Sequence, residues 1–169
     1  MRGTWCRYMA WVLPVWIGLS AAVSCGDSNC MENRSSIPYA VFYNDSVVPQ
    51  RISIDSVSVY GIGQPGDSML LDTARRVSST YLPLRDGRDT TRFVIRYEQH
   101  NLDPRYKADT LTIIYHSYVR FVSAECGAMF NYIIDSLGYT TWQIASAQVV
   151  QREVNNLQTE NVQLFYRTR

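Results

Sequence analysis

The residues of this chain that could carry covalent or metal chemistry are its cysteines and histidines. They are Cys6, Cys25, Cys30, Cys126, His100 and His116. A cysteine thiolate can accept an acyl or alkyl group or pair with a second thiol. Neither histidine has Cys or His neighbours at metal-ligand spacing, and the chain has no Gly-x-Ser-x-Gly or His-Glu-x-x-His sequence. The sequence therefore predicts no enzyme, no metal site and no cofactor, and directs attention to the cysteines.

The first 24 residues have the pattern of an export signal. Arg2 and Arg7 are the only charges in residues 1–24, and residues 9–23 are almost wholly apolar. A positive start, an apolar core of about 15 residues and small residues at its end are typical of a secretory signal peptide. A membrane-spanning helix needs about 20 apolar residues. We therefore predict a cleaved signal peptide over 1–24 and regard an uncleaved anchor as the alternative.

The sequence at the expected cleavage site, Ala22-Val23-Ser24-Cys25, resembles the lipobox of bacterial lipoproteins, with Ala22 where leucine is usual. The resemblance implies that Cys25 becomes the N-terminus and carries acyl chains on its sulfur and its amine. Acyl chains contribute roughly 0.8 kcal/mol per buried methylene, so more than one chain anchors a protein stably. We therefore expect attachment to a membrane through Cys25. The alternative is ordinary cleavage nearby, with Cys25 left as a thiol.

Residues 25–169 have the composition of an ordinary globular domain. Removal of Arg2 and Arg7 leaves 14 of the 16 basic residues and all 15 acidic ones, and this balance argues against nucleic acid binding, which needs a basic surface. A chain of this length can bury a core without metals. In the oxidising compartment that an exported protein reaches, Cys30 and Cys126 most simply form a disulfide. Two free or buried thiols are the alternative.

The polar segment 25–36 reads as a tether, and residues 37–169 as a series of strands. Alternation is clearest at residues 91–97, where Thr91, Phe93, Ile95 and Tyr97 share one face. Leu111, Ile113 and Tyr115 do the same within the predicted strand 110–121. Short strands separated by turn residues indicate an antiparallel β-sandwich, immunoglobulin-like or related. The predicted fold is thus a single all-β domain.

Other segments give more specific expectations. In residues 51–60 the apolar side chains change from even-numbered to odd-numbered positions along the strand. A bulge near Asp55-Ser56 would direct the apolar side chains on both sides of it to the core. Residues 81–84 form a predicted edge strand because Pro83 cannot donate to a neighbouring strand. Residues 123–127 interrupt the chain between two strands, residues 142–154 fit a strand or a helix, and residues 161–166 close the domain as a strand.

Five segments resemble an uncharacterised family of Bacteroidota lipoproteins, domain of unknown function 6452. They are Cys30 after the lipid cysteine, Asp55-Ser-Val-Ser-Val-Tyr-Gly-Ile-Gly63, Tyr81-Leu-Pro-Leu84, Asp109-Thr-Leu-Thr-Ile-Ile-Tyr115 and Phe121-Val-Ser-Ala-Glu-Cys-Gly127. The resemblance implies a lipid-anchored, all-β envelope protein and supports the Cys30–Cys126 pair, and it supplies no activity. Surface lipoproteins of that lineage carry an acidic cluster after the lipid cysteine. Asp27 and Glu32 alone stand there, which favours the periplasmic face of the outer membrane over the cell surface.

Eight of the ten aspartates precede a serine or a threonine. Envelope proteins of the same lineage are O-glycosylated at Asp, then Ser or Thr, then an aliphatic residue, Met or Thr. The resemblance therefore makes Ser46, Ser68, Thr73 and Thr90, all in predicted loops, candidates for O-glycosylation. The structural alternative is that Asp-Ser and Asp-Thr are favourable turn dipeptides.

Two functions fit these observations. The first is a non-catalytic binding or structural module whose loops at one end contact an unknown protein or glycan, with the aromatic loop 97–106 as the nearest candidate surface. The second is a hydrolase of envelope glycan or peptidoglycan, with Glu98 and Asp103 facing each other across a loop. The absence of a recognisable set of nucleophile, base and oxyanion donor favours the first function.

Overall fold

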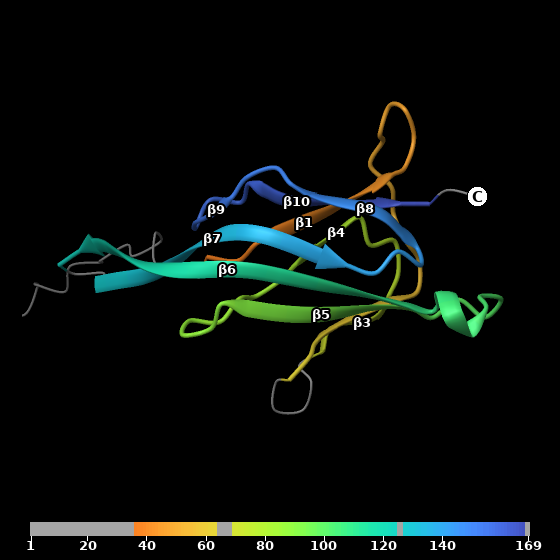
Figure 1. Ribbon diagram of the computed structural model, residues 1–169, viewed down its shortest axis with the longest axis horizontal. Coiled ribbons are helices and arrows are strands. Elements are labelled where there is room, and N and C mark those ends of the chain that lie inside the picture. The colour runs from red at the N-terminus through yellow and green to blue at the C-terminus, as the bar shows by residue number, and fades with distance from the viewer. Residues whose placement is uncertain (1–35, 64–68, 125–126, 168–169) are drawn as a thin grey trace, which may run out of the picture. The chain divides into compact units, whose positions relative to one another are not determined.

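The computed structural model describes residues 36–63, 69–124 and 127–167, and within them the chain is all-β (Figure 1). It forms strands in two sheets, with one short 3-10 turn, η3 (Pro104–Tyr106). The predicted all-β fold is therefore confirmed. Among these residues there is no helix long and apolar enough to cross a membrane.

The smaller sheet has four strands in the order β4-β1-β10-β8. Their bounds are β1 (Tyr39–Asn44), β4 (Ser79–Tyr81), β8 (Ile144–Val149) and β10 (Glu160–Tyr166). β1 and β10 run parallel, whereas the other pairs are antiparallel. The prediction of a purely antiparallel sandwich was wrong at this pair. The alternation of side chains within a strand does not record the direction of its neighbour, and these two strands come from opposite ends of the domain.

The larger sheet has six strands in the order β3-β2-β5-β6-β7-β9, all antiparallel. Their bounds are β2 (Val57–Gly61), β3 (Met69–Ala74), β5 (Thr90–Tyr97), β6 (Ala108–Ser123), β7 (Gly127–Tyr139) and β9 (Glu153–Val154). β6 and β7 are the longest strands and form one hairpin. β6 ends at Ser123 and β7 begins at Gly127, so the predicted interruption at residues 123–127 falls between the two strands of this hairpin.

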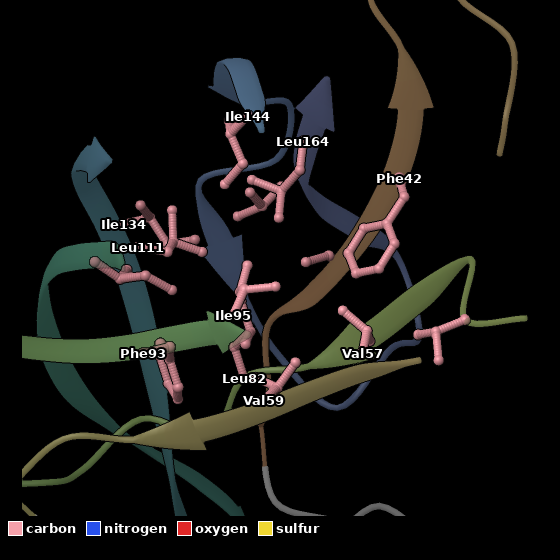
Figure 2. Close-up of a cluster of buried hydrophobic side chains, with 14 of the residues drawn as sticks. Phe42, Val57, Val59, Leu82, Phe93, Ile95, Leu111, Ile134, Ile144 and Leu164 are labelled. Carbon is pink, nitrogen blue, oxygen red and sulfur yellow. The ribbon is translucent and has the colours of Figure 1, made fainter. Parts of the chain in front are cut away.

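The core lies between the two sheets (Figure 2). Both sheets contribute fully buried side chains, among them Phe42, Ile144 and Leu164 from the smaller sheet and Val57, Phe93, Ile95 and Leu111 from the larger one. These residues are apolar and lie on the inner face of their strands, as period-2 alternation requires. The predicted inward residues of β5 and β6 are all buried, so the alternation identified the core face correctly.

The phase change before β2 occurs where it was predicted. Ser56 has a positive φ of 55°, and it separates the bridge between Ile54 and Val77 from the start of β2 at Val57. Ile54 packs against the core from one side of this irregularity, and Val57 is buried within the core on the other side. The irregularity therefore lets both halves of the segment contribute to one core.

The remaining strand predictions can also be judged. β4 is an edge strand, as predicted, but it covers Ser79–Tyr81 and ends before Pro83, whereas the predicted strand covered residues 81–84. Residues 142–154 form β8 and β9, which belong to different sheets, so the strand alternative was correct and the helix alternative was wrong. The chain changes sheet between β7 and β8, and this crossing is where the candidate site is built.

Candidate functional site

A cavity of about 300 Å³ opens at the end of the sandwich where β5 and β10 terminate. Its wall comes from the segment before β2, the loop after β5, the residue before β8 and the end of β10. The lining residues are Ile52, Ser53, Ile54, Asp55, Tyr97, Gln99, Leu102, Gln143, Tyr166 and Arg167. We call this the loop-end cavity. Its lining mixes aliphatic and aromatic surface with amide, hydroxyl and charged groups, a combination typical of small-ligand sites.

Asp109 is the residue that holds this end of the sandwich together. It is fully buried at the start of β6. One carboxylate oxygen accepts hydrogen bonds from Thr140 Oγ1 at 2.7 Å and from the Trp142 amide at 2.9 Å. The other accepts from Tyr97 Oη at 3.1 Å and from the backbone amides of Gln143 and Ile144 at 2.8 and 3.1 Å.

These five bonds satisfy a buried carboxylate that would otherwise be costly to remove from water. They also position the site. The residues from Thr140 to Ile144 connect β7 to β8 across the two sheets, and Asp109 orders their backbone. Because Gln143 and Tyr97 both line the loop-end cavity, the same carboxylate fixes two parts of its wall.

Two buried tyrosines meet beside this carboxylate. The rings of Tyr97 and Tyr166 lie 6.2 Å apart and nearly perpendicular. The Tyr97 hydroxyl donates to Asp109, whereas the buried Tyr166 hydroxyl lies close to Tyr97 but makes no hydrogen bond of normal geometry within the described part of the chain. Burial raises the pKa of both phenols above the ordinary value of 10.0, and the charge of Asp109 raises them further. Tyr166 therefore stays neutral at ordinary pH, with its hydroxyl buried beside Tyr97 and Asp109.

The raised tyrosine pKa values predict a loss of stability in alkali. Above pH 10 the unfolded chain releases phenolic protons that the folded protein keeps, so the free energy of unfolding falls as the pH rises. Each such proton contributes a slope of about 1.4 kcal/mol per pH unit. Tyr166→Phe should therefore reduce this slope. At pH 7 it should cost little stability, because the hydroxyl that it removes makes no hydrogen bond of normal geometry within the described part of the chain.

Urea unfolding between about pH 8 and pH 12, a range centred on the ordinary tyrosine pKa, measures both effects. Tyr60→Phe is the control, because Tyr60 is only partly buried in β2. An unchanged alkaline slope in Tyr166→Phe would show that Tyr166 titrates normally in the folded state.

The structure describes only some of the predicted modification sites. Cys25, Cys30, Cys126 and Ser68 lie outside the described residues, so the lipid anchor, the disulfide and glycosylation at Ser68 stay predictions. Ser46 is exposed after β1, as expected for a loop, and donates hydrogen bonds to Asn44 Oδ1 and the Val48 carbonyl.

Two further candidate acceptors lie in strands rather than in loops. Thr73 is in β3 and Thr90 is the first residue of β5. Their predicted placement in loops was therefore wrong, although both are exposed. Thr73 has a positive φ of 43°, which places it at an irregular point of its strand. Both threonines are accessible, and glycosylation at either one stays a prediction.

The carboxylates of the hydrolase hypothesis each pair with a nearby arginine. Glu98 contacts Arg96 at 3.2 Å, and Asp103 contacts Arg105 at 3.2 Å. Asp103 also accepts a hydrogen bond from the Arg105 amide and caps η3. The bonds from Arg105 hold the pKa of Asp103 below its usual value. Both groups thus have a local structural role in the loop after β5, and neither lines the loop-end cavity.

Sequence reasoning anticipated the loop after β5 but missed Asp109 and Tyr166. A signal for Asp109 was present, because it has the same parity as Leu111, Ile113 and Tyr115. A carboxylate in phase with three core residues must face inward and needs buried hydrogen bond donors. Those donors lie more than 30 residues further along the chain, apart from Tyr97. No local pattern identifies them.

Comparison with known proteins gives one informative result. Neither a curated protein nor a solved structure matches the chain. A sequence family described as a family of unknown function (DUF6452) matches residues 56–166. This region runs from the irregularity before β2 to the end of β10 and includes Asp109 and both cavity tyrosines. The chain therefore belongs to the DUF6452 family.

Proposed function

We propose that the protein is a lipid-anchored module of the bacterial cell envelope that binds a protein or glycan partner without catalysing a reaction. The anchor is the acylated Cys25 expected from the sequence, and the periplasmic face of the outer membrane is the favoured location. The partner binds at the loop-end cavity. The observation that carries this proposal is the loop-end cavity itself, whose wall combines aliphatic, aromatic, amide and charged side chains.

The lining suits a ligand with both apolar and hydrogen-bonding surface. Ile54 and Leu102 offer aliphatic contact. Ser53 and Gln143 add hydroxyl and amide groups that can donate or accept hydrogen bonds. The exposed side chain of Gln99 adds an amide at the rim. A sugar ring has apolar faces and a hydroxyl edge, and a peptide side chain beside its amide has the same character. Either fits the chemistry of this wall.

Site-specific photocrosslinking in native membranes tests the binding surface. A benzophenone amino acid at Gln99 should yield one discrete adduct, because Gln99 lies at the cavity rim. The same probe at Arg92 is the matched control, since Arg92 is also exposed, on β5, but away from the cavity. Leu102→Arg, which places a long cation in the cavity, should abolish the adduct from Gln99.

A second assay addresses a glycan partner directly. Soluble muropeptides and envelope oligosaccharides are titrated into the purified protein, with Leu102→Arg as the non-binding variant. The binding proposal predicts no cleavage of these compounds, whereas the hydrolase alternative predicts cleavage that is lost in Glu98→Gln and Asp103→Asn. Equal crosslinking from Gln99 and Arg92, together with no titration signal, would contradict the loop-end site.

The intact mass of protein purified from its own host's membranes tests the anchor. We expect a chain that starts at Cys25 and carries a diacylglyceryl group and an acyl chain. Reduction should add two hydrogens if Cys30 and Cys126 are paired, and hexose-sized increments would reveal glycosylation. An unlipidated mass would refute the anchor, and a mass without sugar increments would refute glycosylation at every candidate site.

A further inference from the structure

The β6–β7 hairpin carries a row of exposed apolar side chains at its free end. Val119 pairs directly with Phe130, and Phe121 pairs with Ala128. Directly opposed residues in an antiparallel pair share a face, as do residues two apart on one strand. Val119, Phe121 and Phe130 therefore form one surface, with exposed fractions of 60%, 69% and 44%. We call it the hairpin apolar row.

This row continues the core-facing surface of the sheet. Further along the same face, Tyr115 pairs with Ile134 and Ser117 with Tyr132, without a register shift before Phe121. Tyr115 and Tyr132 are buried, and their rings meet at 5.5 Å. Beyond Tyr132 the side chains on this face become exposed, with 44% at Phe130 and 60% at Val119. The face that contributes to the core therefore extends beyond the region in which its side chains are buried.

The chain that follows the predicted tether enters the fold at the same hairpin, on the face opposite this row. Ser36 is the first described residue, and its hydroxyl donates to Asn131 Oδ1 at 2.8 Å. Asn131 follows Phe130 on β7 and points to the opposite face of the sheet. The chain between Cys25 and Ser36 can span at most about 40 Å. A lipid on Cys25 therefore keeps the bilayer surface within reach of the hairpin end.

We propose that the hairpin apolar row lies against the membrane that holds the lipid on Cys25. The proposal rests on the lipid anchor proposed above. Exposed aromatic and aliphatic side chains bind at the boundary between lipid headgroups and acyl chains. Arg120 lies between Val119 and Phe121 in sequence, points to the opposite face of the hairpin and is exposed, so its long side chain offers a cation for lipid phosphates at the edge of the contact.

The proposal fixes the orientation of the domain. In Figure 1 the free end of the β6–β7 hairpin and the loop that carries η3 lie at opposite ends of the sheet. Gln99 and Leu102, which line the loop-end cavity, belong to that loop. A membrane under the hairpin therefore leaves the loop-end cavity pointing away from the bilayer, open to a partner in the envelope.

Tryptophan quenching by brominated phospholipids tests the contact. Trp5, Trp11 and Trp16 lie in residues 1–24, so the mature chain retains Trp142 alone. The full chain is expressed with its signal, purified from membranes and reconstituted in vesicles of phosphatidylethanolamine, phosphatidylglycerol and brominated phosphatidylcholine. Phe121→Trp should lose roughly half of its added emission to the bromines, because its indole would lie in the interface. The unmodified protein is the control, since Trp142 precedes β8 beside the loop-end cavity and should not be quenched.

Phe130→Trp provides a second reporter on the partner strand and should be quenched to a similar extent. Both positions are exposed, so neither variant disturbs the core, and near-ultraviolet circular dichroism checks the fold. If the emission added by the Phe121→Trp variant were not quenched, the membrane contact would be overturned, whatever the emission wavelength. Unquenched emission at short wavelength would indicate that protein covers the row.

The intact mass of the same preparation separates the two proposals. Absence of lipid on Cys25 would overturn the anchor and with it this orientation. Lipidated protein without quenching would overturn the orientation alone.

Discussion

Asp109→Asn is expected to destabilise the folded protein by about 3–5 kcal/mol, because it breaks a buried charged network by changing one partner. The carboxylate accepts five hydrogen bonds, three of them from backbone amides between Trp142 and Ile144. An asparagine keeps one acceptor oxygen and turns an NH₂ group toward the remaining donors. At least two buried donors then lose their acceptor, and each costs about 1–3 kcal/mol. Urea denaturation at pH 7 measures the loss.

Asp89→Asn is the matched control. Asp89 also precedes a threonine and a β-strand, but it is exposed before β5. Its substitution should change the free energy of unfolding by no more than about 0.5 kcal/mol. If Asp109→Asn were as mild as Asp89→Asn, the network around Asp109 would be structurally dispensable. The Asp109 variant should also weaken crosslinking from Gln99, since Asp109 orders Gln143 and Tyr97 in the cavity wall.

Phe42→Ala is expected to cost about 3–5 kcal/mol, the usual range for deletion of a fully buried phenylalanine ring. Phe42 lies at the centre of β1 with no exposed surface. It packs edge-on against Tyr166 at 5.3 Å between ring centres (Figure 2 shows its place in the core). β1 pairs with both β4 and β10, so a void beneath it weakens two strand pairs as well as the core contacts.

Phe165→Ala tests whether burial is the cause. Phe165 is in β10, within the same sheet, but it is only partly buried and contacts Tyr43 at 5.8 Å between ring centres. Its loss should cost about 1 kcal/mol. Equal losses from the two substitutions, measured by urea denaturation at pH 7, would mean that the cavity term does not dominate at position 42.

The two ends of the sandwich differ in chemistry as well as in position. The hairpin end presents aliphatic and aromatic side chains on the hairpin at which the chain that follows the tether enters, and the opposite end presents a polar cavity built around Tyr97 and Tyr166. In the proposed arrangement the anchor and the membrane contact lie at one end and the binding site at the other. A change at Phe121 should then alter membrane contact without altering binding at Gln99, and a change at Leu102 should do the reverse.

The sequence by itself determined the strands and the core face of most of them. Side chains in a strand alternate between faces. The burial of Phe93, Ile95 and Leu111 could therefore be predicted from the local sequence, without knowing which strands are their neighbours. The phase change at Asp55-Ser56 and the edge position implied by Pro83 are also local, because a bulge and a missing donor belong to a single residue or pair. The family could likewise be predicted from the sequence, and the match over residues 56–166 confirmed it.

Only the tertiary structure decided how the strands pair and where the polar groups meet. The parallel pairing of β1 with β10 joins residues more than 100 positions apart, and nothing in either strand specifies its neighbour's direction. The bonds of Asp109 and the contact between Tyr97 and Tyr166 arise in the same way, from segments that become neighbours only after the two sheets pack. A candidate site built from such long-range contacts has no local signature, because its geometry is a property of the packed core and not of any stretch of chain.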